Sequence, residues 1–249
     1  MRYPFVLFDA GGTLFGPRGS FGATYAEVLL PMGLDLPAAG VERELREVWK
    51  EMSGIMPRGI DRYGYFEGGE DGYWLRFARG TIERAAGRQV SSSFAWDALR
   101  RLRQAFREKT AWEVFPDVMP TLALLRDQGV RMGVVSNWDS RLPGLLRTLG
   151  LAVFFDSVIV SHLEGMEKPE PELFRRALAR LGGLPQQTLA VGDVPELDLA
   201  GARAAGIDGV LVDRRGRLGP EVGALPDLVP VARIVAEGLP AGPTWVPGR

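Results

Sequence analysis

The stretch YPFVLFDAGGTL at residues 3–14 decides the fold, because a short apolar run ends abruptly at a carboxylate, two glycines and a threonine. Such a run predicts a strand that is buried on both faces. Gly11 and Gly12 open backbone conformations that other residues avoid and remove side chains that would block a close approach. A ligand at the carboxyl end of this strand, where open α/β sheets bind ligands, would meet Asp9 and the Thr13 hydroxyl. A strand followed by an ordinary glycine turn, with no ligand site, would give the same sequence pattern.

The composition indicates an ordinary globular protein. The 249 residues are 46% hydrophobic and 24% charged, which suits one large domain or two modest ones. A formal net charge of −1 gives no electrostatic case for a nucleic-acid or membrane partner. No apolar run approaches the roughly 18 residues that cross a bilayer, and Asp9 interrupts the only early apolar stretch, so no signal peptide is expected. We therefore expect a cytoplasmic protein that is a monomer or a homodimer.

The residue types limit the chemistry. The chain has no cysteine, and His162 is its only histidine. These counts exclude disulfides, thiolate nucleophiles, cysteine-type zinc sites and multi-histidine metal sites. The only lysines are Lys50, Lys109 and Lys168. Any reaction must therefore depend on carboxylates, hydroxyls, lysine and arginine.

From Asp117 onward, helical and strand patterns alternate along the chain. The expected helices are 118–128, 142–149, 170–181 and 198–205, and the expected strands are 130–135, 158–160, 188–191 and 210–212. Strands that alternate with helices predict a parallel sheet covered by helices on both faces, which is an α/β fold.

Residues 16–114 differ in character, because apolar residues recur there at helical spacing and no strand is evident. We therefore expect a core domain of residues 1–15 and 115–238, with an all-helical domain of residues 16–114 inserted after the first strand. An insert at this point would lie over the ligand-binding end of the sheet and could act as a lid. The tail, residues 239–249, is rich in proline and glycine and is expected to be loose.

Four stretches with polar side chains fall at or beside the carboxyl ends of the predicted strands. They are Asp9–Thr13, Ser136-Asn137, Lys168-Pro169, and Gly192-Asp193 with Asp198. Each has an ordinary interpretation: Ser136 as a turn cap, Lys168 as a solvated residue, Asp198 as a helix cap. Independent coincidence is improbable when all four occur in this order at one end of one sheet.

Together these residues suit phosphate chemistry. A carboxylate such as Asp9 can attack phosphorus and form an aspartyl phosphate, provided that the repulsion between the two anions is cancelled. Asp9 and Asp193 offer the hard oxygen ligands that Mg²⁺ prefers beside a phosphate. The phosphoryl oxygens would be held by hydroxyls, an amide and an ammonium group, which are supplied by Thr13, Ser136, Asn137 and Lys168.

The order and identity of these residues resemble the haloacid dehalogenase-like (HAD) hydrolase superfamily. The resemblance implies a Rossmann-like sheet, Mg²⁺, and a helical cap inserted after the first motif. It also implies phosphatase activity on a small phosphorylated metabolite through an aspartyl phosphate, with Asp9 and Lys168 as catalytic residues. By this resemblance, Asp198 and the backbone carbonyl of Gly11 join Asp9 and Asp193 as metal ligands.

The sequence departs from the family pattern at Gly11. Family phosphatases carry a second aspartate there, two positions after the nucleophile, as general acid and base. Such catalysis is typically worth about 10²–10⁴-fold, so alkyl phosphates are expected to be poor substrates. FDAGGTL together with SNWD resembles a HAD-like subgroup that has this glycine. Three explanations stay open: a good leaving group, an acid supplied by the cap, or no catalytic role.

The insert contains one stretch, 58–77, that suits substrate contacts, because it gathers aromatic side chains around Glu67, Glu70 and Asp71. The same aromatic residues could equally fill the core of the insert. One of the three carboxylates is a candidate for the missing proton donor.

Two other functions remain open. Metal-independent 2-haloacid dehalogenases also lack the second aspartate, but they usually have a tyrosine at that position and have no need of a metal-binding acid such as Asp193. A non-catalytic protein that binds a phosphate ligand or a partner would explain Gly11. It would not explain why Asp9 and Lys168 are both present.

Overall fold

The computed structural model describes residues 1–239, which divide into two compact units. The core unit combines Met1–Gly16 with the described residues from Val114 onward, and the helical unit is Pro17–Glu113. The predicted tail, 239–249, lies outside the described residues except for Leu239. No helix within residues 1–239 is both long and apolar enough to cross a membrane.

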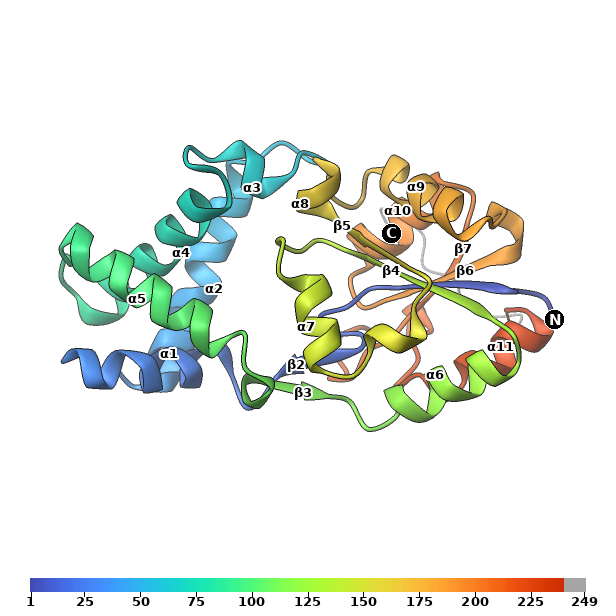
Figure 1. Cartoon of the computed structure of the whole chain (residues 1–249), viewed down its shortest axis with the longest axis horizontal. Helices are drawn as coiled ribbons and strands as arrows, with labels where there is room; N and C mark the ends of the chain where they lie inside the picture. Colours follow the sequence, from blue (N-terminus) through green and yellow to red (C-terminus); the bar gives the residue numbers. More distant parts are fainter. Residues whose placement is uncertain (240–249) are drawn as a thin grey trace. The chain divides into compact units, whose positions relative to one another are not determined.

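A five-stranded parallel sheet forms the centre of the core unit, in the order β5-β4-β1-β6-β7 (Figure 1). Its strands are β1 (Phe5–Phe8), β4 (Arg131–Ser136), β5 (Ser157–Val160), β6 (Thr188–Gly192) and β7 (Asp208–Leu211). The predicted α/β fold with a Rossmann-like parallel sheet is confirmed.

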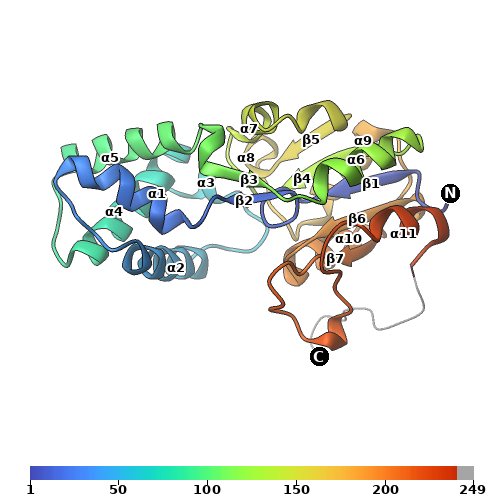
Figure 2. The same ribbon diagram turned by 90° about the horizontal axis from the view of Figure 1, so that it is seen from below.

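Helices cover both faces of this sheet, α9 and α10 on one side and α6, α7 and α11 on the other (Figures 1 and 2). The α-helices of the core unit are α6 (Val118–Asp127), α7 (Leu142–Thr148), α8 (Ser161–Glu164), α9 (Pro171–Leu181), α10 (Ala200–Ala204) and α11 (Val231–Glu237). Its short turns of 3₁₀ or π type are Ala152–Phe154, Pro185–Gln187, Pro195–Leu199 and Pro220–Val222. Alternate strand residues such as Leu7 and Ile159 pack against the apolar side of α9, which includes Leu173 and Phe174.

The register of the sheet explains why distant polar residues converge. Phe8 at the end of β1 pairs with Val134 of β4 and with Val191 of β6. The residues that follow these positions therefore reach the same edge of the sheet. The Asp9 amide donates a hydrogen bond to the Val191 carbonyl at 2.8 Å, which fixes the point where the Asp9–Thr13 loop leaves the sheet.

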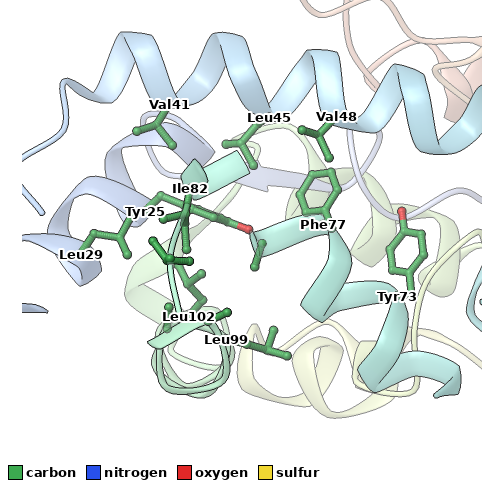
Figure 3. Close-up of a cluster of buried hydrophobic side chains, with 14 of the residues drawn as sticks. Tyr25, Leu29, Val41, Leu45, Val48, Tyr73, Phe77, Ile82, Leu99 and Leu102 are labelled. Atoms are coloured by element: carbon green, nitrogen blue, oxygen red, sulfur yellow. The ribbon is translucent and has the colours of Figure 1, made fainter. Parts of the chain in front are cut away.

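The helical unit is built from five α-helices: α1 (Phe21–Leu29), α2 (Ala38–Gly54), α3 (Arg62–Tyr65), α4 (Gly69–Ala86) and α5 (Ser92–Ala105). Two 3₁₀ turns, Leu30–Met32 and Lys109–Ala111, complete it. Buried side chains from α1, α2, α4 and α5 meet in one apolar cluster (Figure 3). Labelled members of that cluster include Tyr25, Leu45, Phe77 and Leu99. The helical spacing of apolar residues in the sequence reflects this shared core.

The expectation that the insert contains no strand is wrong at its two ends. A two-stranded sheet joins β2 (Phe15–Pro17) to β3 (Trp112–Val114), where the chain passes between the units. Strands of three residues are too short to show an alternating pattern, so they have no period that could be detected in the sequence.

An ion pair ties three segments of the core unit together. The Arg214 guanidinium donates to both carboxylate oxygens of Asp117, at 2.7 and 2.9 Å, and to the Thr13 carbonyl, at 2.8 Å. It also lies 4.1 Å from the centre of the Phe115 ring. Burial favours a higher pKa for Asp117, but hydrogen bonds from Arg214 and from the Leu228 amide outweigh it, so this pKa lies below its usual value.

We expect Asp117→Asn to lower the free energy of unfolding by about 2–3 kcal/mol at pH 7, because a charged hydrogen-bond pair is lost. The depressed pKa makes this contribution complete above the unfolded value of about 3.9. The contribution begins to fall below about pH 4 and disappears as pH drops through the lower folded value, so the difference between wild type and variant should narrow over that range. Urea unfolding from pH 3 to 7 measures this difference, and a gap that stays constant down to pH 3 would contradict the assignment.

Candidate functional site

Asp9 lies at the centre of the site, with only 9% of its surface exposed. Its Oδ1 atom accepts a hydrogen bond from Ser136 Oγ at 2.9 Å and forms an ion pair with Lys168 Nζ at 2.5 Å. Within the described chain, no hydrogen-bond partner is found for Oδ2. One oxygen is thus held in place while the other is available to a ligand.

Lys168 bridges two carboxylates. Its buried ammonium lies 2.5 Å from Asp9 Oδ1 and 2.5 Å from Asp198 Oδ1. Burial alone would lower the pKa of Lys168, but the negative charges of Asp198 and Asp9 outweigh burial and raise it. The side chain therefore carries a permanent positive charge beside Asp9.

Two side chains hold the backbone of the neighbouring loops. Asn137 uses both ends of its amide on Lys168: Nδ2 donates to the Lys168 carbonyl at 3.0 Å, and Oδ1 accepts from the Lys168 amide at 2.7 Å. Asp198 Oδ2 accepts from the Asp193 and Val194 amides, at 3.0 and 2.9 Å. Asp198 therefore acts as a backbone cap through one oxygen and as a partner of Lys168 through the other.

Three carboxylates form a candidate metal centre. Asp9, Asp193 and Asp198 each offer an oxygen, and these oxygens lie within 4.8 Å of one another. Burial, followed by the charges of Asp9 and Asp198, raises the pKa of Asp193 to about 7. Burial also raises the pKa of Asp9, against the opposing effect of Lys168. A hard divalent cation would offset the repulsion between these crowded carboxylates, so the residues present fit Mg²⁺.

Position 12 requires a glycine because the Asp193 carboxylate lies very close to the backbone there. Gly12 has a φ of +87°, which only glycine adopts readily, and a Cβ atom there would lie 2.3 Å from Asp193 Oδ2. Gly192 is similarly close to Asp198, because its Cβ would lie 2.2 Å from Asp198 Cγ. Both glycines allow the acidic side chains to approach the backbone.

Thr13 presents a buried hydroxyl that no described residue engages. Within residues 1–239, its Oγ1 atom has no hydrogen-bond partner. Its carbonyl, in contrast, accepts hydrogen bonds from Arg214 Nε and from a terminal nitrogen of the same guanidinium, at 3.2 and 2.8 Å. A buried polar atom without a partner costs about 1–3 kcal/mol, which is consistent with a site that awaits a polar ligand.

Gly11 faces an aromatic side chain. A Cβ atom at Gly11 would lie 2.7 Å from Cζ3 of Trp138, closer than real Cβ contacts occur. The Trp138 ring also makes an edge contact with the buried ring of Phe15, with centroids 5.6 Å apart. The indole therefore occupies the space into which a side chain at position 11 would extend.

Comparison with known proteins shows the family of this chain. The family model for haloacid dehalogenase-like hydrolases matches residues 3–206. The chain belongs to this family. It is 34% identical over 219 residues to the haloacid dehalogenase-like hydrolase domain-containing protein 3 of Danio rerio, covering 86% of this chain and 88% of the relative.

Other HAD-like proteins are similar over most of their length. The glyceraldehyde 3-phosphate phosphatase of Methanopyrus kandleri is 30% identical over 224 residues, covering 85% of this chain and 84% of the relative. The crystal structure of a HAD phosphatase from Thermococcus onnurineus superposes with a TM-score of 0.60 at 24% identity, covering 99% of this chain and 100% of that one. At that identity, the structural likeness supports the HAD-like fold alone.

The hydrolase brings most of the sequence-predicted residues to one edge of the sheet. Asp9, Ser136, Lys168 and Asp198 are linked by direct contacts, and the Asp193 carboxylate lies among the same acidic oxygens. The Asn137 amide, predicted to bind phosphate, is engaged on both its O and N atoms by the Lys168 backbone. It therefore positions the lysine loop in this structure.

The aromatic stretch at 58–77 of the hydrolase packs mainly on itself. Tyr63 and Tyr73 are buried, with ring centroids 4.9 Å apart, and belong to the core of the helical unit. Of the three candidate acids, Glu70 and Asp71 pair with Arg103, whereas Glu67 is exposed. Tyr63 and Tyr73 therefore fill the core of the helical unit, which is one of the two interpretations of this stretch.

Sequence reasoning missed two residues of the hydrolase that shape the site. Trp138 follows directly after the predicted Ser136-Asn137 pair, and its proximity to Gly11 arises only in the folded chain. Arg214 is one of many arginines, and nothing local in the sequence distinguishes it. The tryptophan within the SNWD motif was the only feature of the sequence that could have pointed to either residue.

We expect Gly12→Ala to weaken Mg²⁺ binding to the hydrolase at least about tenfold, because the new methyl group would displace the Asp193 carboxylate. Gly33→Ala is the matched control: Gly33 has a φ of +85°, but a Cβ added there would have open space within 4 Å. Both variants should lose about 1–2 kcal/mol of stability from the left-handed backbone. Titration calorimetry with Mg²⁺ separates them, and equal affinities would refute the steric explanation.

Proposed function

We propose that this hydrolase is a Mg²⁺-dependent phosphatase that acts on a small phosphorylated metabolite through an aspartyl phosphate on Asp9. The observation that carries the proposal is the arrangement around this carboxylate. Lys168 and Ser136 hold Oδ1, Oδ2 is available, and two further carboxylates lie nearby. The phosphatase name of the Methanopyrus kandleri relative supports the same class of reaction.

In the proposed reaction, Asp9 Oδ2 attacks phosphorus as the bond to the leaving-group oxygen breaks, and the leaving group departs with that electron pair. Water then attacks the phosphorus of the aspartyl phosphate, and the bond between phosphorus and Asp9 breaks. These steps release inorganic phosphate and regenerate the carboxylate. The raised pKa of Asp9 indicates a carboxylate that burial makes less stable, so its attack is favoured once a cation is near.

The residues beside Asp9 have complementary roles. Asp9, Asp193, Asp198 and the Gly11 carbonyl would hold Mg²⁺, which, when bound, offsets the repulsion between the carboxylate and the phosphoryl oxygens. Lys168 provides a fixed positive charge for the negative charge that develops in the transition state. The Thr13 hydroxyl, which has no partner among the described residues, would donate to a phosphoryl oxygen. The Ser136 hydroxyl would do so only by giving up its hydrogen bond to Asp9 Oδ1, and Asn137 keeps the Lys168 loop in place.

We also propose that the helical unit, Pro17–Glu113, is a cap that contributes to substrate selection. It is inserted shortly after the Asp9–Thr13 loop, and it has its own cluster of buried apolar side chains. An insert that folds around its own core can present its exposed residues without losing stability.

The proposal is tested by incubating the purified chain with acetyl phosphate or p-nitrophenyl phosphate, with Mg²⁺ or with EDTA. We expect phosphate release that requires Mg²⁺. Halide release from 2-chloropropionate in EDTA would instead identify a metal-independent dehalogenase. Binding of phosphate without turnover of either activated substrate would identify a binding protein.

A further inference from the structure

Gly11 is a glycine for a reason other than backbone geometry. Its φ does not lie in the left-handed region, in contrast to that of Gly12. Another residue could therefore adopt the backbone conformation. The obstacle is Trp138, whose Cζ3 atom lies 2.7 Å from the position of a Cβ. The indole, rather than the turn, excludes a side chain from position 11.

The Trp138 backbone is hydrogen-bonded, and its ring packs against a buried aromatic side chain. Its backbone amide donates to Ser161 Oγ at 3.1 Å, and its carbonyl accepts from the same hydroxyl at 3.1 Å and from the His162 amide at 3.3 Å. The indole itself makes an edge contact with Phe15, which is fully buried. A side chain at position 11 would have to displace the indole from the position that makes this contact.

The titratable side chains around Asp9 are already committed. Lys168 is paired with two carboxylates, and Asp193 and Asp198 belong to the acidic cluster. The Arg217 guanidinium lies 3.7 Å from Asp193 Oδ2 and is its ion-pair partner. Within the described residues of the core unit, these groups are engaged with one another, so none of them is an uncommitted proton donor for a departing alkoxide.

We infer that Trp138 is a specificity-determining residue that restricts this site to phosphates whose leaving group departs as a stable anion. Acyl phosphates and aryl phosphates are the substrate classes that fit. This inference rests on the proposed phosphatase function. When their P–O bond breaks, the oxygen keeps the electron pair as a carboxylate or a phenolate, with conjugate-acid pKa values of about 4 and 10. An alkoxide, with a basicity near that of hydroxide, needs a proton that an apolar indole edge does not supply.

The steric part is tested by thermal unfolding of four proteins: wild type, Gly11→Ala, Trp138→Ala and the double variant. Gly11→Ala should lower Tm by about 2–10 °C in the wild-type background, because the methyl group overlaps the indole. In the Trp138→Ala background, the same change should lower Tm by less than half as much. Equal losses in the two backgrounds would overturn the inference.

The functional part is tested by kcat/KM for acetyl phosphate, phenyl phosphate and glycerol 3-phosphate. Wild type should favour the first two over the alkyl ester by at least about 10²-fold. Gly11→Asp on the Trp138→Ala background should raise the alkyl activity at least about tenfold relative to Trp138→Ala, because an acid then has room beside Asp9. The same aspartate should give no gain when Trp138 is present. It should also give none in combination with Trp96→Ala, which removes an exposed tryptophan of the helical unit.

The proposed function and the role of Trp138 can fail separately. Absence of turnover with all three substrates would refute the proposed function. Rapid hydrolysis of glycerol 3-phosphate by wild type would leave the phosphatase function standing and overturn the role of Trp138. A gain in alkyl activity from Gly11→Asp alone would also overturn it.

Discussion

Asp9→Asn should reduce phosphatase turnover by at least about 10⁴-fold, because an amide oxygen does not form the covalent intermediate that the carboxylate forms. The loss should be in kcat, and phosphate should still bind, since Ser136, Thr13 and Lys168 remain. Steady-state kinetics with acetyl phosphate at saturating Mg²⁺ measures the effect. Asp35→Asn, at an exposed position in the helical unit, is the matched control and should leave kcat unchanged.

The same substitution should not destabilise the protein. Burial raises the pKa of Asp9, so folding disfavours its ionised form at neutral pH. A neutral amide removes this penalty, and Lys168 keeps Asp198 as its counter-charge, so Tm in the absence of Mg²⁺ should stay close to that of wild type. A variant turnover above one part in 10³ of the wild-type value would contradict the assignment of Asp9 as the nucleophile. Loss of the folded state would contradict the claim that the Asp9 carboxylate is held at a cost in stability.

Lys168→Met should have the second largest effect, on activity and on stability together. Removing the buried ammonium leaves Asp9 and Asp198 without their shared counter-charge. Breaking a buried ion pair from one side typically costs about 3–5 kcal/mol. We also expect kcat to fall by at least about 10³-fold, because the fixed charge opposite the phosphoryl oxygens is lost. Urea unfolding and initial rates on the same preparation measure the two effects.

A double variant separates these two roles of Lys168. Adding Asp198→Asn to Lys168→Met removes one unpaired carboxylate and should restore part of the lost stability, without restoring turnover. Lys50→Met, at an exposed position, should change neither quantity. If the double variant regained activity along with stability, Lys168 would be structural and the proposed electrostatic role would be wrong.

The fold could be predicted from the sequence because its signals are local. Apolar runs that stop at polar residues marked the strands, and helices that end at glycine marked the intervening segments. Gly129, Gly150, Gly182 and Gly206 all have positive φ values, which is the conformation that favours glycine after a helix. The parallel register then places the residues after β1, β4 and β6 at one edge, which the alternating pattern implies.

The details of the candidate site could not be predicted in the same way, because they depend on contacts between residues far apart in the chain. Nothing near Asn137 indicates that its amide will hold the backbone of Lys168 rather than face a ligand. The closeness of Trp138 to Gly11 depends on how two loops fold over the sheet edge. The role of Arg214, which reaches both Asp117 and Thr13, depends on a loop that follows the last strand.

The paired strands β2 and β3 have a consequence for how this chain could be rebuilt. The Arg18 amide donates to the Ala111 carbonyl at 2.9 Å, and the Phe115 amide donates to the Leu14 carbonyl at 3.2 Å, so the points of departure and return are hydrogen-bonded neighbours. The helical unit, nearly a hundred residues, therefore connects β2 to β3 in the way that a very long hairpin loop would. The entropy cost of closing such a loop grows only slowly with its length. Replacing the helical unit with a short turn between β2 and β3 should leave the strand order of the core unit unchanged. Another domain whose termini lie close together could be inserted at the same point.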